Sequence, residues 1–212
     1  MHEWWFLHYQ LLIKSGLTKT DLKNVVESKK IALRPGALDF FDFLYSHKIP
    51  LVILSSAGVG AETIALYLEK FAKLYDNIYI ASNEFVWDKN EKALGVKEPI
   101  IHTFNKDFSA VKEFSFYKKI ENRKNVILLG DVLGDADMLN GFEYDNVIKI
   151  GFLNENSQGE LAAFKNNYDI IILNDGTMDH ILESFKQAFD VVILNDGPMD
   201  FVNILLKELL IH

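Results

Sequence analysis

The sequence of 212 residues contains no cysteine. This absence excludes a disulfide framework, a thiol nucleophile and a cysteine-based zinc site. The sequence also lacks an apolar run long enough to span a membrane, and its first residues carry no basic segment typical of a signal peptide. We therefore expect a soluble, cytoplasmic protein that does not act on a membrane.

Positive charge is scarce, because 22 Lys and Arg stand against 30 Asp and Glu, for a net charge of -8. Such an acidic chain repels the phosphate backbone of nucleic acids, so a nucleic acid polymer is not the expected partner. A smaller anionic substrate would need local positive charge or a metal ion. Hydrophobic residues make up 49% of the chain, which is enough for one globular domain, or one and a half, with a substantial core.

The most informative stretch runs from Asn125 to Asp135. An apolar run typical of a strand buried on both faces ends at Gly130-Asp131, and Asp135 follows at the start of the next expected helix. Open α/β sheets bind their ligands beyond the carboxyl ends of their strands. Two carboxylates at this place suit Mg²⁺, which binds through one or two carboxylates together with substrate phosphate. The alternative is a strand-end turn with a helix-capping aspartate.

Helical and strand patterns alternate along the rest of the chain, which predicts a doubly wound α/β fold. Trp4 and Trp5 lie in the first expected helix and are interpreted as core or interdomain packing residues; the alternative is a ligand platform. Thr18 and Asp21 have the spacing of a capping box. The expected helices cover 2–14, 19–28, 35–47, a segment ending near 74, 108–121 and 158–166; the expected strands cover 51–54, 78–81, 126–129 and 147–153, with a hairpin over 84–96.

Two further places could bind phosphate. The small residues of 55–60 follow a buried strand and precede a helix, where backbone N–H groups form an anion site. The alternative is a tight turn that only requires small residues. Lys106 ends an extended segment before another expected helix and could supply a fixed positive charge. A single lysine is more often a surface residue. In the same way, a single histidine such as His102 is more often a structural residue than a metal ligand or an acid.

The C-terminal part contains an internal repeat. Residues 168–179 are echoed by residues 189–200, and each copy reads as a strand, a turn and a helix. Two copies are too few for a solenoid, so we interpret them as a tandem duplication of one sheet element.

Together, these residues resemble a known superfamily. Ser56 after an apolar strand, Lys106 before a helix and the Gly-Asp-x-x-x-Asp of Asp131 and Asp135 resemble motifs II, III and IV of the haloacid-dehalogenase phosphatases. The closer resemblance, over residues 2 to 180, is to the cytosolic pyrimidine 5'-nucleotidase family (type III). It rests on six ordered blocks: Glu3-Trp4-Trp5, Phe40-Phe41-Asp42, Ser56-Ala57-Gly58-Val59-Gly60, Ile101-His102-Thr103-Phe104-Asn105-Lys106, Leu128-Leu129-Gly130-Asp131 and Lys149-Ile150-Gly151-Phe152-Leu153-Asn154.

The resemblance implies a haloacid-dehalogenase-like core with a mainly parallel sheet and an incomplete helical cap. We expect residues 1–32 to be the cap remnant, 33–180 the core without its first strand, and 181–212 the duplicated strand–helix element. The implied reaction is Mg²⁺-dependent hydrolysis of a nucleoside 5'-monophosphate, with a preference for pyrimidines, through an aspartyl-phosphate. The sequence leaves the oligomeric state open.

The resemblance also implies roles for individual residues. Asp131 would coordinate Mg²⁺ with support from Asp135, and Lys106 would neutralise charge on the phosphate and the nucleophile. The phosphoryl oxygens would be bound by the Ser56 hydroxyl and by nearby backbone N–H groups, at Ala57 and Gly58. This division fits the demands of phosphoryl transfer, which are positioning and charge stabilisation.

The sequence departs from the family pattern in two ways. The nucleophile of the family lies in a DxDxT-type motif on a strand before the Glu-Trp-Trp block, and this sequence has neither aspartate; its only imitation, 173–177, has Leu173 at the nucleophile position. Tyr9 stands where a cap histidine is expected, with His8 beside it, which puts nucleobase recognition in doubt. The alternative function is therefore a relative that binds Mg²⁺, phosphate or nucleotide without catalysis.

The missing strand would lie between the strands at 51–54 and 126–129, so its absence leaves two apolar edges unpaired. Three explanations compete. The sequence is a fragment or a mispredicted gene product, which we favour; a partner chain supplies the strand; or one duplicated C-terminal strand fills the gap.

Overall fold

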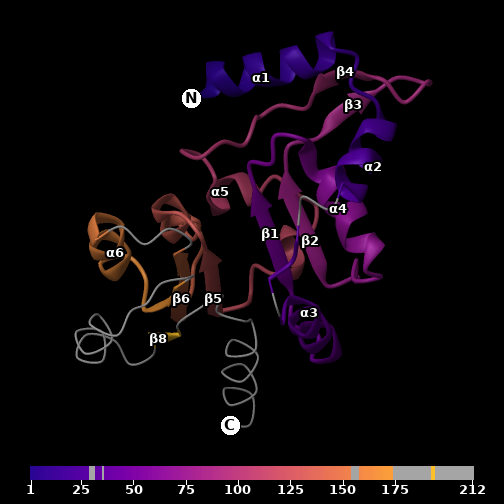
Figure 1. Cartoon of the computed structure of the whole chain (residues 1–212). Coiled ribbons are helices and arrows are strands. Elements are labelled where there is room, and N and C mark those ends of the chain that lie inside the picture. The colour runs from indigo at the N-terminus through magenta and orange to yellow at the C-terminus, as the bar shows by residue number, and fades with distance from the viewer. Residues whose placement is uncertain (29–31, 35, 154–157, 174–191, 194–212) are drawn as a thin grey trace. The chain divides into compact units, whose positions relative to one another are not determined.

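The computed structural model describes residues 1–28, 32–34, 36–153, 158–173 and 192–193 (Figure 1). The chain divides into two compact units, which are described separately. The first unit comprises Met1–Leu33 and Phe41–Tyr117, and the second comprises Arg34–Phe40 and Lys118–His212. In the described part, helices alternate with mainly parallel strands, which confirms the predicted α/β class. None of its helices combines the length and the apolar character needed to cross a membrane.

The first unit begins with two helices, α1 (His2–Lys14) and α2 (Lys19–Glu27). The predicted capping box at the start of α2 is confirmed, because the Asp21 N–H donates to the Thr18 hydroxyl (3.3 Å) and the Thr18 N–H donates to the Asp21 carboxylate (2.8 Å). This reciprocal pair satisfies two backbone N–H groups at the start of the helix. A local sequence signal therefore fixes where α2 begins.

A β-hairpin of β3 (Phe85–Trp87) and β4 (Ala93–Val96) packs against α1. The predicted hairpin is confirmed, and its turn is held by the Asp88 carboxylate, which accepts hydrogen bonds from the N–H groups of Asn90 (2.7 Å) and Lys92 (2.9 Å). In Figure 1 the indigo α1 lies beside this hairpin. Between them lies a core cluster formed by Tyr9, Leu17, Leu22, Phe85, Ala93 and Ile100.

The two tryptophans of α1 differ in environment. Trp5 packs against the core cluster as predicted. Trp4 does not, because 59% of its surface is exposed. Of the predicted alternatives, core or interdomain packing, core packing is therefore wrong for Trp4, and interdomain packing stays a prediction. The helical spacing alone could not separate two adjacent aromatic residues onto different faces.

The sheet of the first unit consists of β1 (Leu51–Ser55) and β2 (Ile78–Ser82), joined by α4 (Gly60–Lys70). The two strands are parallel, with Leu51 opposite Ile78 and Ser55 opposite Ser82. Both strands therefore end at the same edge of the sheet, where the segment 56–60 begins. A further helix, α3 (Ala37–Ser46), includes residues of both units.

The predicted helix over 108–121 is wrong. The chain forms a single helical turn, α5 (Phe108–Val111), and later a short 3₁₀ helix, η1 (Tyr117–Lys119). Phe116 stacks on Tyr79 of β2, with ring centroids 4.9 Å apart. Aromatic residues have modest helix propensity, so this tertiary contact outweighs the local preference.

The second unit contains a parallel sheet in the order β5–β6–β7–β8. Its strands are β5 (Asn125–Gly130), β6 (Asn146–Leu153), β7 (Ile170–Leu173) and β8 (Val192–Ile193), with the 3₁₀ helix η2 (Leu133–Asp137) after β5 and the helix α6 (Gln158–Lys165) after β6. Gly130 lies opposite Gly151, so β5 and β6 run together to the carboxyl edge of the sheet.

The repeat is visible in this sheet, because Ile171 of the first copy pairs with Val192 of the second. The other residues of the repeat after position 173 lie outside the described residues. β8 is at the end of the sheet opposite β5. The proposal that the duplicated strand fills the gap between the strands at 51–54 and 126–129 is therefore wrong. Among the described residues, β1 pairs only with β2 and β5 only with β6.

Candidate functional site

The structure brings Asp131 and Asp135 together at the carboxyl end of β5. The Asp131 N–H donates to the Asp135 carboxylate over 3.0 Å. Asp135 is only 3% exposed, whereas Asp131 is exposed. Asp135 lies inside η2 and not at its N-cap, which is Val132. The capping alternative is therefore not what places Asp135, and its carboxylate instead fixes the turn that presents Asp131.

Two side chains from other elements hold this turn in place. The Tyr168 hydroxyl donates to the Val132 carbonyl (2.6 Å), and the Lys149 ammonium donates to the Ala136 carbonyl (2.8 Å). Burial, followed by the neighbouring carboxylates of Asp135 and Asp131, raises the pKa of the Tyr168 hydroxyl. The hydroxyl therefore stays protonated and remains a donor. Sequence reasoning did not predict either contact, because the partners are remote in sequence.

The donor set of this turn is compatible with Mg²⁺ but does not complete its coordination. It supplies one exposed and one buried carboxylate, and Mg²⁺ commonly takes one or two carboxylates, several waters and substrate phosphate. No group of three or more His, Asp or Glu side chains able to hold a metal occurs within the described ranges. The metal roles of Asp131 and Asp135 stay predictions.

In the first unit, the predicted phosphate loop follows β1, and α1 fixes its backbone. The Tyr9 hydroxyl donates to the Ala57 carbonyl (3.0 Å), and His8 Nε2 donates to the Gly58 carbonyl (2.9 Å). A side chain at position 58 would collide with His8, since a Cβ there would lie 2.9 Å from Nε2. Tyr9 and His8 therefore fix the backbone of the loop by donating hydrogen bonds to its carbonyl groups.

The N–H groups of the same loop point to anion binding. Gly60 N–H donates to the Ala57 carbonyl (3.1 Å) and Ala61 N–H to the Asn83 carbonyl (2.7 Å). By contrast, the N–H groups of residues 57–59 donate to no other residue in the part of the chain that the structure describes. Consecutive backbone N–H groups without protein acceptors form a typical anion-binding concavity. Phosphate binding by this loop stays a prediction, and so does the alternative of a tight turn.

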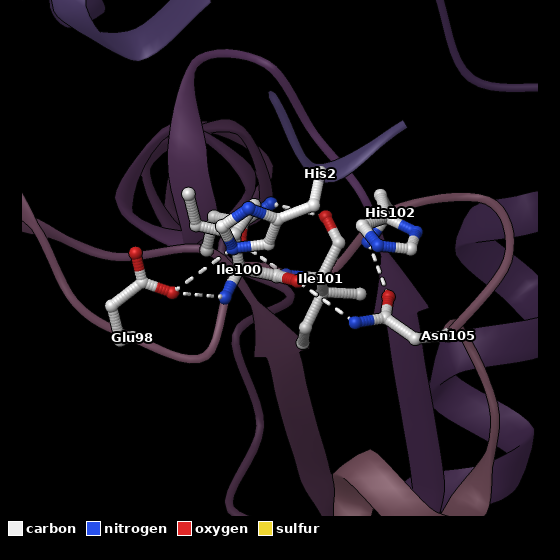
Figure 2. Close-up of polar contacts among 7 residues, drawn as sticks. His2, Glu98, Ile100, Ile101, His102 and Asn105 are labelled. Atoms are coloured by element: carbon white, nitrogen blue, oxygen red, sulfur yellow. Dashed lines mark hydrogen bonds and ion pairs between the residues drawn. The ribbon is translucent and has the colours of Figure 1, made fainter. Parts of the chain in front are cut away.

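Lys106 is half-buried and directly precedes Asp107, the N-cap of α5. Figure 2 shows the loop before it, in which the Asn105 amide donates to the Ile100 carbonyl (2.9 Å) and accepts from the His102 N–H (2.6 Å). The Ile100 N–H in turn donates to the Glu98 carboxylate (3.0 Å). These contacts tie together the backbone of the loop that leads to Lys106.

His102 has a structural role in this loop. Its Nδ1 accepts a hydrogen bond from the Phe104 N–H (3.2 Å), and burial lowers the pKa of the imidazole. A neutral histidine with an occupied Nδ1 is neither poised as an acid nor arranged as a metal ligand. His2 lies near it, between the Glu98 and His102 labels of Figure 2, and forms an ion pair with Glu98 when protonated (3.5 Å).

Ser56, Ala57, Gly58 and Lys106 all belong to the first unit, and Asp131 and Asp135 belong to the second. The structure confirms the local setting of each group: a loop after a strand, a lysine before a helical turn, and paired aspartates after a strand. Their assignment to one substrate stays a prediction.

A parallel α/β fold with these three settings is typical of haloacid-dehalogenase-like phosphatases. The family described as Pyrimidine 5'-nucleotidase (UMPH-1) matches residues 1–183. The chain belongs to this family. Similar proteins include 7-methylguanosine phosphate-specific 5'-nucleotidase A of Xenopus laevis, 37% identical over 180 residues, which covers 84% of this chain and 61% of the relative.

Two further comparisons agree. The human 7-methylguanosine phosphate-specific 5'-nucleotidase is 35% identical, over 84% of this chain and 59% of its own length. The crystal structure of cytosolic 5'-nucleotidase IIIB bound to cytidine has the same fold, with a TM-score of 0.64 at 24% identity, over 91% of this chain and 57% of that chain. The present chain thus spans about three fifths of the length of the curated relatives that it matches.

Proposed function

We propose that this chain carries the phosphate-binding and metal-binding residues of a Mg²⁺-dependent 5'-nucleotidase that acts on nucleoside 5'-monophosphates. The observation that carries the proposal is the row of N–H groups at residues 57–59, which lack protein acceptors among the described residues while the adjacent carbonyls are held by α1. Such a row suits a dianionic phosphate ester better than a neutral ligand.

Each group has a separate role in the proposal. The Ser56 hydroxyl and the N–H groups of Ala57 and Gly58 bind the phosphoryl oxygens, and Lys106 places a positive charge beside them. Asp131 and Asp135 would hold Mg²⁺, which supplies charge neutralisation when it is bound.

The two-step reaction of the family would transfer the phosphoryl group to an aspartate before water releases it. That aspartate is not in a DxDxT-type motif of this sequence. The alternative proposal follows from this departure: the chain binds Mg²⁺, phosphate or nucleotide and does not turn substrate over.

The substrate class rests on the relatives. Two are named as specific for 7-methylguanosine phosphate, and the solved neighbour is bound to cytidine. We propose a nucleoside 5'-monophosphate, with pyrimidines as the first candidates, and a cytoplasmic location, as in the relative from Caenorhabditis elegans that is named cytosolic. We also retain the proposed division into a cap remnant (1–32), a core (33–180) and a duplicated element (181–212).

The test is phosphate release from CMP, UMP and 7-methylguanosine monophosphate by the purified chain, with Mg²⁺ and with EDTA. Asp131→Asn removes the exposed carboxylate at the carboxyl end of β5. Asp145→Asn is the matched control, because Asp145 is an exposed aspartate just before β6, at the opposite edge of the same sheet.

Mg²⁺-dependent release that Asp131→Asn abolishes and Asp145→Asn preserves would support the enzyme and reveal a nucleophile outside the DxDxT pattern. Mg²⁺-dependent nucleotide binding without release, measured by calorimetry, would support the binding-only alternative. A folded chain that neither binds nor hydrolyses any of the three nucleotides contradicts both proposals.

A further inference from the structure

Asn83 directly follows β2 and contacts both segments of the first unit that are proposed to meet phosphate. Its carbonyl accepts the Ala61 N–H in the first turn of α4 (2.7 Å). Its amide group donates to the Ile101 carbonyl (2.9 Å) and accepts from the Ile101 N–H (2.7 Å). The side chain is 3% exposed. A single buried residue therefore joins the helix after the phosphate loop to the loop that carries Lys106.

The last residue of the phosphate loop, Gly60, also lies close to Asn83. Gly60 has a φ of +80°, and a Cβ there would lie 3.1 Å from the Asn83 carbonyl oxygen. Burial raises the pKa of the Tyr9 hydroxyl, and the nearby Asn83 amide offsets part of this rise. Tyr9 in turn donates to the Ala57 carbonyl (3.0 Å). The loop thus lies between α1 and Asn83.

We propose that Asn83 is a positioning residue that fixes the phosphate loop and the Lys106 loop in a single arrangement, so that both meet the same phosphate group. This inference rests on the proposed function. Asparagine suits the task because its amide nitrogen donates to the Ile101 carbonyl while its amide oxygen accepts from the Ile101 N–H. An ionised carboxylate has no donor for the carbonyl. Phosphate contacts made by two rigid loops need no reordering when the ligand binds.

The first measurement uses the full chain without ligand, so it does not depend on the proposed function. Asn83→Ala removes the two bonds to Ile101, and we expect faster amide hydrogen exchange at Ile101 and also at Ala61. Asn77→Ala is the matched control, because Asn77 precedes the same strand, is 9% exposed and donates from its amide to the Ile49 carbonyl (2.7 Å). Faster exchange at Ile101 alone, or equal exchange in both variants, would overturn the coupling of the two loops.

The second measurement is a titration with inorganic phosphate, followed by the N–H signals of residues 57–61. We expect Asn83→Ala to weaken phosphate binding about tenfold relative to Asn77→Ala, the factor that corresponds to one well-formed hydrogen bond. Two variants of equal stability but different phosphate affinity separate positioning from a general loss of structure. Equal affinity in both variants contradicts the proposal.

A third variant keeps the test decisive if Asn83→Ala does not fold. Asn83→Asp has nearly the same shape and retains the acceptor for the Ile101 N–H, but it loses the donor to the Ile101 carbonyl. We expect exchange to rise at Ile101 and phosphate affinity to fall; unchanged exchange and affinity would refute the role of the amide. Absence of phosphate binding by the unmodified chain would instead refute the proposed function, and the exchange experiment would still judge the coupling.

Discussion

Gly130 offers a sharp test of how the Asp131–Asp135 turn is built. A Cβ at position 130 would lie 2.5 Å from the Asp135 Cβ and 2.6 Å from the Tyr168 hydroxyl. Neither neighbour can move without losing a hydrogen bond, since Asp135 accepts from the Asp131 N–H and Tyr168 donates to the Val132 carbonyl. We therefore predict that Gly130→Ala strains the turn that presents Asp131.

The cost can be estimated from two opposing effects. Overpacking a rigid site costs about 1–3 kcal/mol. Replacing glycine by alanine raises the free energy of unfolding by about 0.4–1 kcal/mol, because the unfolded chain becomes less flexible. The net free energy of unfolding should thus fall by about 1–2 kcal/mol. With a urea dependence of about 2 kcal/mol per M, the unfolding midpoint should fall by about 0.5–1 M.

The assay is urea unfolding followed by far-UV circular dichroism. Tryptophan fluorescence is not suitable as the main signal, because Trp4, Trp5 and Trp87 all belong to the first unit. Gly159→Ala in α6 is the control, since a Cβ there meets nothing within 4 Å, and it should be neutral or stabilising. A midpoint for Gly130→Ala at or above that of the unmodified chain would refute the reasoning, provided that the control behaves as expected.

Two further predictions concern the first unit. Lys73 donates to both Asp42 carboxylate oxygens (2.6 Å each) and Tyr75 to one of them (2.5 Å), which holds the pKa of Asp42 below its usual value. The charged carboxylate therefore adds stability above its unfolded pKa of about 3.9, and this stability is lost as the pH falls through the lower folded value. Asp42→Asn should lower the urea midpoint at pH 7, and the difference from the unmodified chain should shrink as the pH falls below about 3.9; a constant difference would contradict the assignment. Thr18→Ala should cost about 1 kcal/mol of unfolding free energy by removing the cap of α2, measured against the exposed Thr20→Ala, and equal losses would argue against the capping box.

Local signals in the sequence predicted local structure well. The capping box at Thr18, the hairpin over 84–96 and the apolar strand that ends at Gly130 depend on residues close to one another in sequence, and all three are confirmed. The helix expected over 108–121 failed because Phe116 stacks on Tyr79, a residue from another element. Periodicity does not carry information about such a contact.

In the candidate site, too, residues with local sequence signals could be predicted and residues with long-range contacts could not. Asp131 and Asp135 could be found because a Gly-Asp turn after a buried strand is visible in one stretch of sequence. Asn83 and Tyr168 could not, because their partners at Ile101, Ala61 and Val132 are far along the chain. For Asn83 there was one usable signal, namely a polar residue at the carboxyl end of an apolar strand, the edge at which α/β proteins bind their ligands.

The pairing of the two repeat copies has a consequence for how the sheet tolerates change. Ile171 and Ile172 of β7 pair with Val192 and Ile193 of β8, which are the equivalent positions of the second copy. Among the described strands, β8 is an edge strand that pairs only with β7. The pairing of β5, β6 and β7 is therefore uninterrupted, and the hydrogen bonds of Tyr168 and Lys149 to the Asp131 turn are retained. At the edge of a sheet, a strand can be added without separating two strands that already pair with each other. The second copy of the repeat thus extends the sheet of the second unit at the end opposite β5, so its pairing does not involve the strand that ends at Asp131.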